Sequence, residues 1–354
     1  MAILHTADLH LAEDKEENWA ALDELVSLAG AHNVSGLVIS GDLFDHDAEA
    51  EKLRSRLRTS LGGGDFQTVI LPGNHDHRAY RSGLYFGENV SVINSWEEPV
   101  RLEEAVIWGL PYEQISAERL VGRLREMAVR MDPDRPNYLL FHGELLDAYF
   151  SREDMGDEGG IRYMPARLSY FERLPLQYVL AGHFHSRYAG WQLPGGGLFI
   201  YPGSPVAITR RETGIRKANL VSPGKDPLEI SLNTCHYEEM VIDLDPFSSE
   251  SPLAIIGRRL KAAHRKAKIF LTVQGFFNGS LLGLTERELA EGVKSLVGEK
   301  LAGEPALKFY DVRHIMEDDL FRQFESRLDE TELTPDHKER VKEMLINAFR
   351  VVKT

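Results

Sequence analysis

Five short motifs in the first 185 residues carry side chains that bind metal ions. They are Asp8-Leu9-His10, Gly41-Asp42, Gly73-Asn74-His75-Asp76, His142-Gly143 and Gly182-His183-Phe184-His185. Asp8 and His10 point to the same side of an extended segment, because side chains alternate along it, and His183 and His185 repeat this spacing. Imidazole, carboxylate and amide ligands in this mixture suit divalent cations of hard to borderline character. The chemistry indicated is a site for two divalent metal ions.

Each motif follows a short apolar run of the kind that forms a buried strand. The runs are Ile3–Thr6, Leu37–Ser40, Thr68–Leu71, Tyr138–Phe141 and Tyr178–Ala181. Helical patterns separate them, namely the face made by Trp19, Leu22, Val26 and Ala29, the stretch Ala48–Leu61 and the stretch 117–130. Hairpin-like segments are expected around 88–110, and strands with tight turns in 189–205. This alternation predicts an α/β sandwich, whose strands deliver the motifs to the edge where open sheets build their sites.

None of the motifs indicates a metal site by itself. A His-x-His on a strand or a Gly-Asp turn is more often structural, but five such motifs in one order at strand ends favour a site. The glycines before Asp42 and Asn74 allow sharp turns that aim those side chains inward. His5 lies inside the first strand and is expected to be a buried, hydrogen-bonded histidine. Supporting or surface roles are expected for three residues near the motifs, His46, Asp47 and His77.

The pattern restarts after about residue 235 as a small unit of alternating strands and helices. Its elements are a strand (Glu239–Leu244), a helix (251–263), a strand (Lys268–Gln274), a helix (Thr285–Val297) and a strand (Ala306–Val312). Helical stretches near 317–328 and 335–350 end the chain. We therefore predict three parts, a metal-binding domain over 1–235, a second domain over 236–314 and a helical tail over 315–354.

The composition narrows the class of protein. Hydrophobic residues make up 43% and charged residues 27%, which fits a globular fold rather than a disordered chain. The single cysteine, Cys235, excludes an intrachain disulfide framework and a cysteine-cluster metal site. No apolar run approaches the roughly 18 residues that span a bilayer, and the start Met-Ala-Ile-Leu-His enters a strand without a secretion leader. We expect a cytoplasmic protein with no membrane attachment.

The charge is unevenly distributed along the chain. The net charge of −14 argues against a protein that coats nucleic acid by bulk attraction. The first 250 residues carry 23 Lys and Arg against 39 Asp and Glu, whereas residues 251–354 carry 18 against 16. This is consistent with an acidic metal-binding domain followed by a different unit, on which a local basic face could still contact nucleic acid.

The ordered motifs resemble the calcineurin-like metallophosphoesterase superfamily and, within it, the SbcD-type DNA repair exonucleases. The segments that carry the resemblance are His5–Leu11, Gly41–Asp45, Tyr201–Pro205 and Arg210–Gly214, and the resemblance covers residues 1 to about 222. It implies a metallophosphoesterase β-sandwich flanked by helices, followed by a small α+β capping domain and C-terminal helices. The second domain resembles the family's capping domain in element order only.

The resemblance also implies a role for each motif residue. One divalent metal ion would be held by Asp8, His10, Asp42 and His185, and the other by Asp42, Asn74, His142 and His183. His75 would face the phosphate and Asp76 would orient it. The implied metal is manganese, although the ligand set alone also suits zinc or iron. The chain departs from the family at Asp45, where many nucleases have histidine, and at Ala12, where glycine is usual, which leaves DNA positioning and the balance of endonuclease and exonuclease activity open.

The helix expected over 251–263 has two different faces. Leu253, Ile256, Leu260 and Ala263 form an apolar stripe, and Arg258, Lys261 and Arg265 project from the opposite side. This basic side is either a solvated surface or a ridge that contacts DNA phosphates.

The terminal helices also carry apolar stripes. One consists of Leu320, Phe324 and Leu328, and the other of Val341, Leu345, Ala348 and Val352, widened by Met344 and Phe349. They either fold back on the chain or, as the resemblance implies, dock onto the coiled coil of an SMC-like ATPase subunit.

Three functions fit these features. The first is a manganese-dependent DNA nuclease, with DNA, the ATPase and a second copy of the chain as candidate partners. The second is a phosphodiesterase or phosphatase that acts on a small nucleotide. The third is a non-enzymatic scaffold that recruits the ATPase while its own site is idle.

Overall fold

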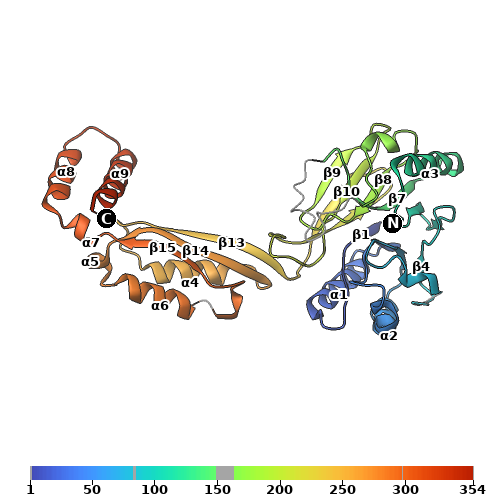
Figure 1. The fold of residues 1–354 in the computed structure, drawn as a ribbon, viewed down its shortest axis with the longest axis horizontal. Coiled ribbons are helices and arrows are strands. Elements are labelled where there is room, and N and C mark those ends of the chain that lie inside the picture. Colours follow the sequence, from blue (N-terminus) through green and yellow to red (C-terminus); the bar gives the residue numbers. More distant parts are fainter. Residues whose placement is uncertain (1, 83–84, 149–162, 297, 354) are drawn as a thin grey trace. The chain divides into compact units, whose positions relative to one another are not determined.

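The computed structural model describes residues 2–82, 85–148, 163–296 and 298–353 (Figure 1). The chain divides into two compact units, Met1–Tyr237 and Glu238–Thr354, called here the first and the second unit. The predicted division into 1–235, 236–314 and 315–354 stays a prediction. None of the described helices combines the length and the apolar character that a bilayer span requires.

The first unit contains two six-stranded sheets. The first sheet has the order β12 (Leu228–Ser231), β11 (Lys217–Val221), β1 (Ile3–Thr6), β2 (Gly36–Ser40), β3 (Gln67–Leu71) and β4 (Val90–Val92). The second has the order β5 (Val100–Arg101), β6 (Val106–Leu110), β7 (Asn137–His142), β8 (Tyr178–Gly182), β10 (Leu198–Tyr201) and β9 (Ala189–Gln192). Strands β1 to β4 are parallel, as are β6, β7, β8 and β10.

Apolar side chains of the two sheets meet between them. Val38 and Val69 of the first sheet share one core with Leu140 and Leu180 of the second. Helices α1 (Glu16–Ala31) and α2 (Glu49–Leu61) pack on the outer face of the first sheet, and α3 (Ala117–Arg130) and η3 (Leu168–Phe171) on that of the second (Figure 1). The central strands are thus covered on both faces, which is why their sequences are continuous apolar runs. The predicted α/β sandwich flanked by helices is confirmed.

The segment 88–110 differs from its prediction. It was expected to form hairpin-like structure, yet only β5 and β6 pair antiparallel, while β4 adds to the first sheet parallel to β3. The segment therefore connects the two sheets, because its apolar residues divide between them: Val92 packs with the outer core of the first sheet and Val106 with that of the second.

The second unit is a three-stranded sheet with helices. The strand order is β13 (His236–Leu244), β14 (Ala267–Phe277) and β15 (Ala306–Asp311), and β14 and β15 are parallel. Helices α4 (Pro252–Ala262) and α6 (Glu286–Leu296) share a core with the strands, in which Ile256, Leu289 and Val273 are fully buried. The expected alternation of strands and helices is confirmed. Short helical segments α5 (Gly279–Leu282), η4 (Gly298–Lys300) and α7 (Arg313–Met316) complete the connections.

The terminal helices α8 (Asp319–Asp329) and α9 (Pro335–Lys353) form a small core of their own with the end of the sheet. Phe321 and Ile346 are fully buried against Val312, with Phe247 and Phe276 beside them. The predicted stripes were only partly right, since Leu320 is 61% and Met344 71% exposed and Ala348 lies outward. The side chain of Val352 lies outside the described residues.

Candidate metal centre

The loops after β1, β2 and β8 hold ligand-type residues in a strained backbone conformation. Asp8, His10, Asp42 and His183 have φ values of 58°, 46°, 50° and 93°. A positive φ is uncommon for residues with a side chain and costs about 1–3 kcal/mol, and such residues gather at functional sites. Among the described non-glycine residues, only Asn33 and Met164 share this feature. The strain therefore marks four of the predicted ligands.

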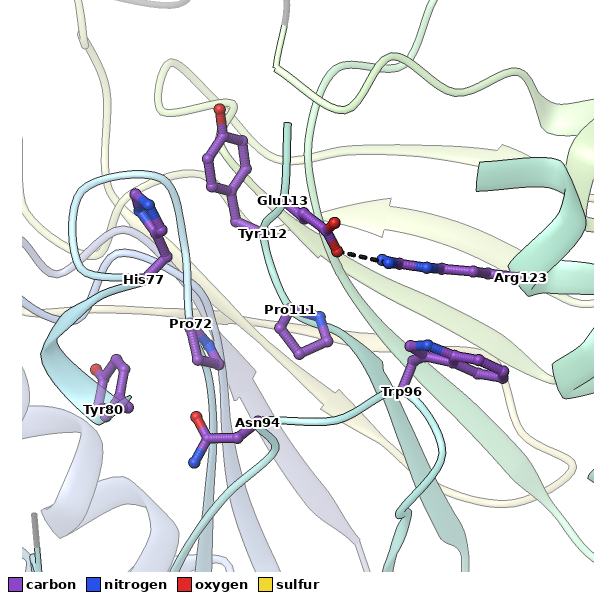
Figure 2. A pocket seen from close by; sticks show the side chains of 9 residues that line it. All are labelled: Pro72, His77, Tyr80, Asn94, Trp96, Pro111, Tyr112, Glu113 and Arg123. Carbon is purple, nitrogen blue, oxygen red and sulfur yellow. Dashed lines mark ion pairs between the residues drawn. The ribbon is translucent and has the colours of Figure 1, made fainter. Parts of the chain in front are cut away.

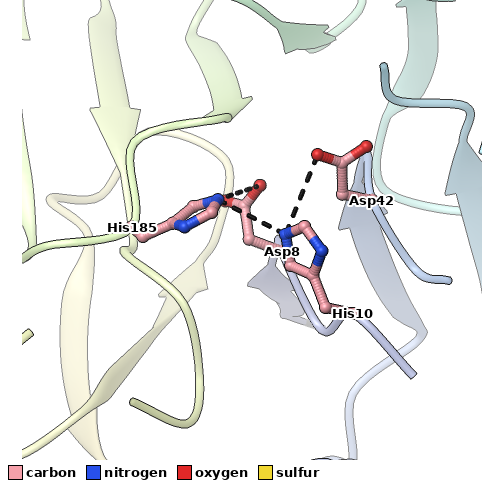
Figure 3. A group of neighbouring side chains, drawn as sticks. All are labelled: Asp8, His10, Asp42 and His185. Carbon is pink, nitrogen blue, oxygen red and sulfur yellow. Dashed lines mark hydrogen bonds and ion pairs between the residues drawn. The ribbon is translucent and has the colours of Figure 1, made fainter. Parts of the chain in front are cut away.

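Asp8, His10, Asp42 and His185 form a buried cluster (Figure 3). One ligand atom of each lies within 4.8 Å of those of the other three. His10 Nε2 lies 3.4 Å from His185 Nε2 and 3.9 Å from Asp42 Oδ2. His185 Nε2 lies 3.5 Å from Asp8 Oδ1. Two carboxylates and two imidazoles that converge in this way suit one divalent cation, and they are the residues expected to hold one.

The second predicted ligand set lies beside the first. His142 Nε2 lies 3.1 Å from Asp42 Oδ2 and 2.9 Å from Asn74 Oδ1. The ring centroid of His183 lies 5.5 Å from that of His142, and its backbone N–H donates to the Asp8 carboxylate. Asp42 thus contacts both sets, as a carboxylate shared by two cations must. The structure brings all seven residues together, and their roles as ligands stay a prediction.

Acceptors on the outer side of two imidazoles, those of His142 and His10, turn their Nε2 atoms toward the cluster. His142 Nδ1 donates to the carbonyl at the end of β2 at 2.8 Å. His10 Nδ1 lies 3.3 Å from a carboxylate oxygen of Asp45. His185 Nδ1 lies 3.8 Å from a carboxylate oxygen of Glu212, a distance that gives a charge interaction but is too long for a hydrogen bond. An acceptor at Nδ1 fixes the proton there and leaves the Nε2 lone pair for a metal ion. The tautomers expected of metal ligands are therefore favoured.

Charges within the cluster oppose the effect of burial. Burial alone would raise the pKa of Asp42, but the imidazoles of His142, His10 and His75 outweigh it and hold that pKa well below its usual range. Burial would lower the pKa of His142, but the carboxylates of Asp42 and Asp8 raise it to about 10. The carboxylates are thus ionised, and a cation at His142 Nε2 must displace a proton. Metal binding is therefore expected to release protons.

Two glycines allow the loops to come this close. A side chain at Gly41 would collide with the ring of His142, and one at Gly73 would collide with the carboxylate and backbone of Asp42. Gly41 also has a φ of 95°, which residues with a side chain rarely adopt. The glycines before Asp42 and Asn74 therefore serve close approach as well as turning.

His75 lies at the edge of the cluster. Its ring centroid is 4.7 Å from that of His10, and its Nδ1 lies 2.8 Å from the carbonyl oxygen of Asp45. Since that carbonyl can only accept, Nδ1 is the donor. Asp45 thus holds His75 through its carbonyl and His10 through its carboxylate, which Lys15 also contacts at 2.8 Å.

The expected role of Asp76 in orienting His75 stays a prediction, and the hydrogen bonds of Asp76 go to other groups. The Asp76 carboxylate accepts hydrogen bonds from the backbone N–H groups of Gly73 and Phe44 and from the Tyr80 hydroxyl. It therefore ties the loop after β3, which carries His75, to the loop after β2, while the direct contact of the His75 ring is with the carbonyl of Asp45. Burial, followed by the charge of Asp42, raises the pKa of Asp76 to about 7.

A buried network around Glu212 was not assigned a role from the sequence. The Glu212 carboxylate accepts from Ser204 Oγ at 2.8 Å and from backbone N–H groups of the same turn. Arg216, itself buried, donates to the carbonyls of His185, Ser186 and Ser204. The network fixes the loop that presents His185. The only sequence signal was the resemblance of segments 201–205 and 210–214, which did not indicate this function.

His5 lies inside β1, as the sequence predicted. The prediction for His5 is confirmed, because it is fully buried and its Nδ1 lies 3.0 Å from Asn219 Nδ2.

Arg265 is not on α4, which ends at Ala262, so the expected helical ridge is shorter than predicted. Arg258 forms an ion pair with Glu250, and Lys261 is exposed. Contact of Arg258, Lys261 and Arg265 with DNA stays a prediction.

Comparisons with known proteins agree with this geometry. Residues 1–187 match the family model described as calcineurin-like phosphoesterase. The DNA double-strand break repair protein Mre11 of Sulfurisphaera tokodaii is 27% identical over 233 residues, which is 59% of this chain and 55% of that protein. A subunit of the nuclease SbcCD of Escherichia coli is 25% identical over 274 residues, 65% of this chain and 66% of that protein.

Two further matches, one relative and one solved structure, say less about function. The uncharacterized metallophosphoesterase YhaO of Bacillus subtilis is 24% identical and matches 69% of this chain and 63% of that protein. The crystal structure of TT1561 of Thermus thermophilus superimposes with a TM-score of 0.44 at 14% identity, covering 65% of this chain and 98% of that one. The chain spans less than two thirds of the length of the three curated relatives, Mre11, the SbcCD subunit and YhaO.

Proposed function

The chain belongs to the calcineurin-like phosphoesterase family, and from this premise we propose that it is a two-metal-dependent DNA nuclease of the SbcD type, which hydrolyses phosphodiester bonds in DNA repair. One observation carries the proposal. Three imidazole Nε2 atoms, of His10, His142 and His185, converge with the carboxylates of Asp8 and Asp42 in one buried region at the ends of strands from both sheets.

The cluster fits two divalent cations, which we take to be manganese. Asp8, His10, Asp42 and His185 would hold one, and Asp42, Asn74, His142 and His183 the other. When bound, such a pair neutralises the charge of a phosphodiester and lowers the pKa of a water molecule toward neutrality. The burial of six of these seven ligands excludes bulk water, which strengthens every electrostatic interaction with the phosphate.

His75 is the residue proposed to act on the phosphate. Its Nδ1 donates to the carbonyl of Asp45, so Nε2 is the atom that would act on the phosphate, and it can donate a hydrogen bond or a proton only when both ring nitrogens are protonated. The neighbouring ring of His10 fixes the side from which His75 approaches. Asp76 acts indirectly, because its hydrogen bond to Gly73 holds the loop that carries His75.

The relatives and the second unit favour DNA over a small nucleotide. One protein named for DNA double-strand break repair, the Mre11 of Saccharolobus solfataricus, is 24% identical and matches 77% of this chain, a larger share than residues 1–237 make up, whereas the Mre11 of Sulfurisphaera tokodaii and the SbcCD subunit match 59% and 65%. The similarity therefore extends into the second unit, which a small substrate would not require. This supports the nuclease without excluding the phosphodiesterase or phosphatase alternative.

The DNA contact proposed for the second unit involves Arg258, Lys261 and Arg265. Changing all three to Gln should weaken DNA binding about equally for all sequences, and the slope of log affinity against log salt should flatten by roughly 0.9 per lost duplex contact. Hydrolysis of a small chromogenic diester should not change. An unaltered salt slope would mean that these residues are only a solvated surface.

Two partners are proposed for the same protein. An SMC-like ATPase would dock on the exposed apolar residues of α8 and α9, including Leu320 and Met344. A second copy of the chain would form a homodimer, for which sedimentation at several concentrations is the test.

A digestion panel tests the proposed function. The protein is incubated with manganese, magnesium, zinc or iron and with single-stranded DNA, duplex DNA, a cyclic nucleotide or a chromogenic diester. We expect manganese-dependent cleavage of DNA that is lost in His75→Ala. Cleavage of the cyclic nucleotide alone would favour the small-nucleotide enzyme. No cleavage of any substrate, together with retained binding of the ATPase, would favour the idle scaffold.

A further inference from the structure

A pocket of about 450 Å³ opens in the first unit beside the loop that carries Asn74 and His75 (Figure 2). Its walls come from four parts of the chain: the loop after β3, the loop between β4 and β5, the segment after β6, and α3. The rings of His77, Trp96 and Tyr112 face it, and all three are half-buried. A volume of this size is typical of small-molecule sites.

The polar groups of the pocket do not suit an anion. Its one arginine, Arg123, is paired with Glu113 at 2.6 Å, as the dashed line in Figure 2 shows. A phosphate would have to break that ion pair and then lie against the Glu113 carboxylate. A flat, uncharged ring with donors and acceptors on its edge fits better, because it can stack on the aromatic walls while its edge meets Asn94 or the ion pair.

A continuous row of aromatic rings links the pocket to the metal centre. The ring centroids of His77 and Tyr112 are 5.3 Å apart, those of Tyr112 and Tyr163 are 5.9 Å apart, and those of Tyr163 and His183 are 5.0 Å apart. The backbone gives a second link, since His77 Nδ1 lies 3.1 Å from the carbonyl oxygen of Asn74. The Cα atoms of His75 and His77 are at most about 7 Å apart, because only two peptide units separate them.

We propose that this pocket binds the nucleobase of the nucleotide whose phosphate lies at the metal centre. The proposal rests on the proposed phosphodiesterase function and names the part of the substrate that the enzyme recognises. Tyr112 is the stacking platform, and Trp96 lines the pocket on the side of Arg123 (Figure 2). Stacking tolerates every base, because each presents a flat face, so the pocket would hold DNA in place without selecting a sequence.

The test compares two dinucleotide substrates with the same phosphodiester. One carries both bases, and the other has an abasic sugar at each position. With manganese present, the wild-type protein should show a KM about tenfold lower for the base-bearing substrate, the size of effect that one stacked base provides. Tyr112→Leu should raise that KM to the abasic value, so that the enzyme no longer distinguishes the two substrates. Tyr170→Leu is the matched control, since Tyr170 is half-buried against the same core but does not line the pocket.

A binding measurement separates this inference from the proposed function. Deoxyadenosine, which has no phosphate, is titrated into the full-length protein without metal while the indole N–H signals of the four tryptophans are followed by NMR. We expect the Trp96 signal to shift, and Tyr112→Leu to weaken the titration about tenfold. If the wild type cleaves both dinucleotides equally and no signal shifts, the pocket proposal is overturned while the phosphodiesterase stands. If neither dinucleotide is cleaved but Trp96 shifts, the base pocket stands and the proposed reaction fails.

Discussion

Acid should destabilise the first unit through His5. This imidazole is fully buried in β1, and burial lowers its pKa to about 3 although the Asp8 carboxylate acts in the opposite direction. Asn219 Nδ2 lies 3.0 Å from its Nδ1, so the neutral ring is the form that the fold accommodates. Unfolding restores the ordinary value of 6.5. Below pH 6.5, His5 therefore binds a proton in the unfolded chain but stays neutral in the folded chain.

The size of the effect follows from these two values. The stabilisation by neutral His5 is fully present above pH 6.5, falls by up to about 1.4 kcal/mol per pH unit below it, and stops falling near pH 3. Between pH 7 and pH 4.5 the protein should lose about 2.5 kcal/mol through this group. That is a large part of the roughly 5–15 kcal/mol by which a typical domain is stable.

The change to test is His5→Asn, whose side-chain oxygen can still accept from Asn219. Free energies of unfolding are measured by urea denaturation at several pH values between 7 and 4.5, with a chelator present so that metal binding does not contribute. The variant should be less stable than the wild type at pH 7, because its side chain is smaller, but the difference should shrink by about 2.5 kcal/mol at pH 4.5. His32→Asn, at an exposed histidine, controls for loss of an imidazole. A difference that does not change with pH would refute the reasoning.

Three other predictions concern the site and the terminal helices. His75→Ala should lose hydrolysis but still bind two metal ions by elemental analysis, whereas Asp42→Asn should lose metal, and equal loss in both would contradict the roles proposed. Glu212→Gln should weaken metal affinity by about 10–100-fold and lower the melting temperature, because it removes the negative charge beside His185 and places an NH2 donor in a network where both carboxylate oxygens accept; unchanged affinity in a metal titration would leave Glu212 a structural role alone. Leu320→Asp with Met344→Asp should abolish co-purification with an SMC-like ATPase while DNA cleavage and melting stay as in the wild type, and continued co-purification would exclude this surface as the docking site.

The predictable parts of the fold are the strands in which every residue is buried. Strand β1 begins and ends as predicted at Ile3 and Thr6, because it is covered on both faces and only apolar or hydrogen-bonded side chains fit. The site motifs were visible for a related reason. Only a few residue types can bind a metal ion, and in this fold such residues lie in loops that follow a strand. The residue type and the place after an apolar run therefore indicated the ligands together.

Other features of the site and the fold leave no pattern of residue types in the sequence. The carbonyl of Asp45 contacts His75, and because any residue type supplies a carbonyl, no residue type in the sequence marks this contact; the role expected of Asp76 came from the resemblance. The contact of Glu212 with His185 joins residues that are 27 positions apart and depends on a turn built by Ser204 and Arg216. Helix α4 ends at Ala262 because Ala263 has an extended ψ of 149°, a change of backbone that the periodicity through Arg265 did not reveal.

The origin of the ligands in two different sheets has a mechanical consequence. Asp8, His10, Asp42 and Asn74 follow strands of the first sheet, while His142, His183 and His185 follow strands of the second. Bound cations would therefore act as cross-links between the sheets, in a chain whose single cysteine cannot supply one by disulfide bonding. Unlike a disulfide, such a cross-link opens when a chelator or a proton competes for its ligands. Catalysis and the cohesion of the sandwich would then depend on the same set of coordinate bonds.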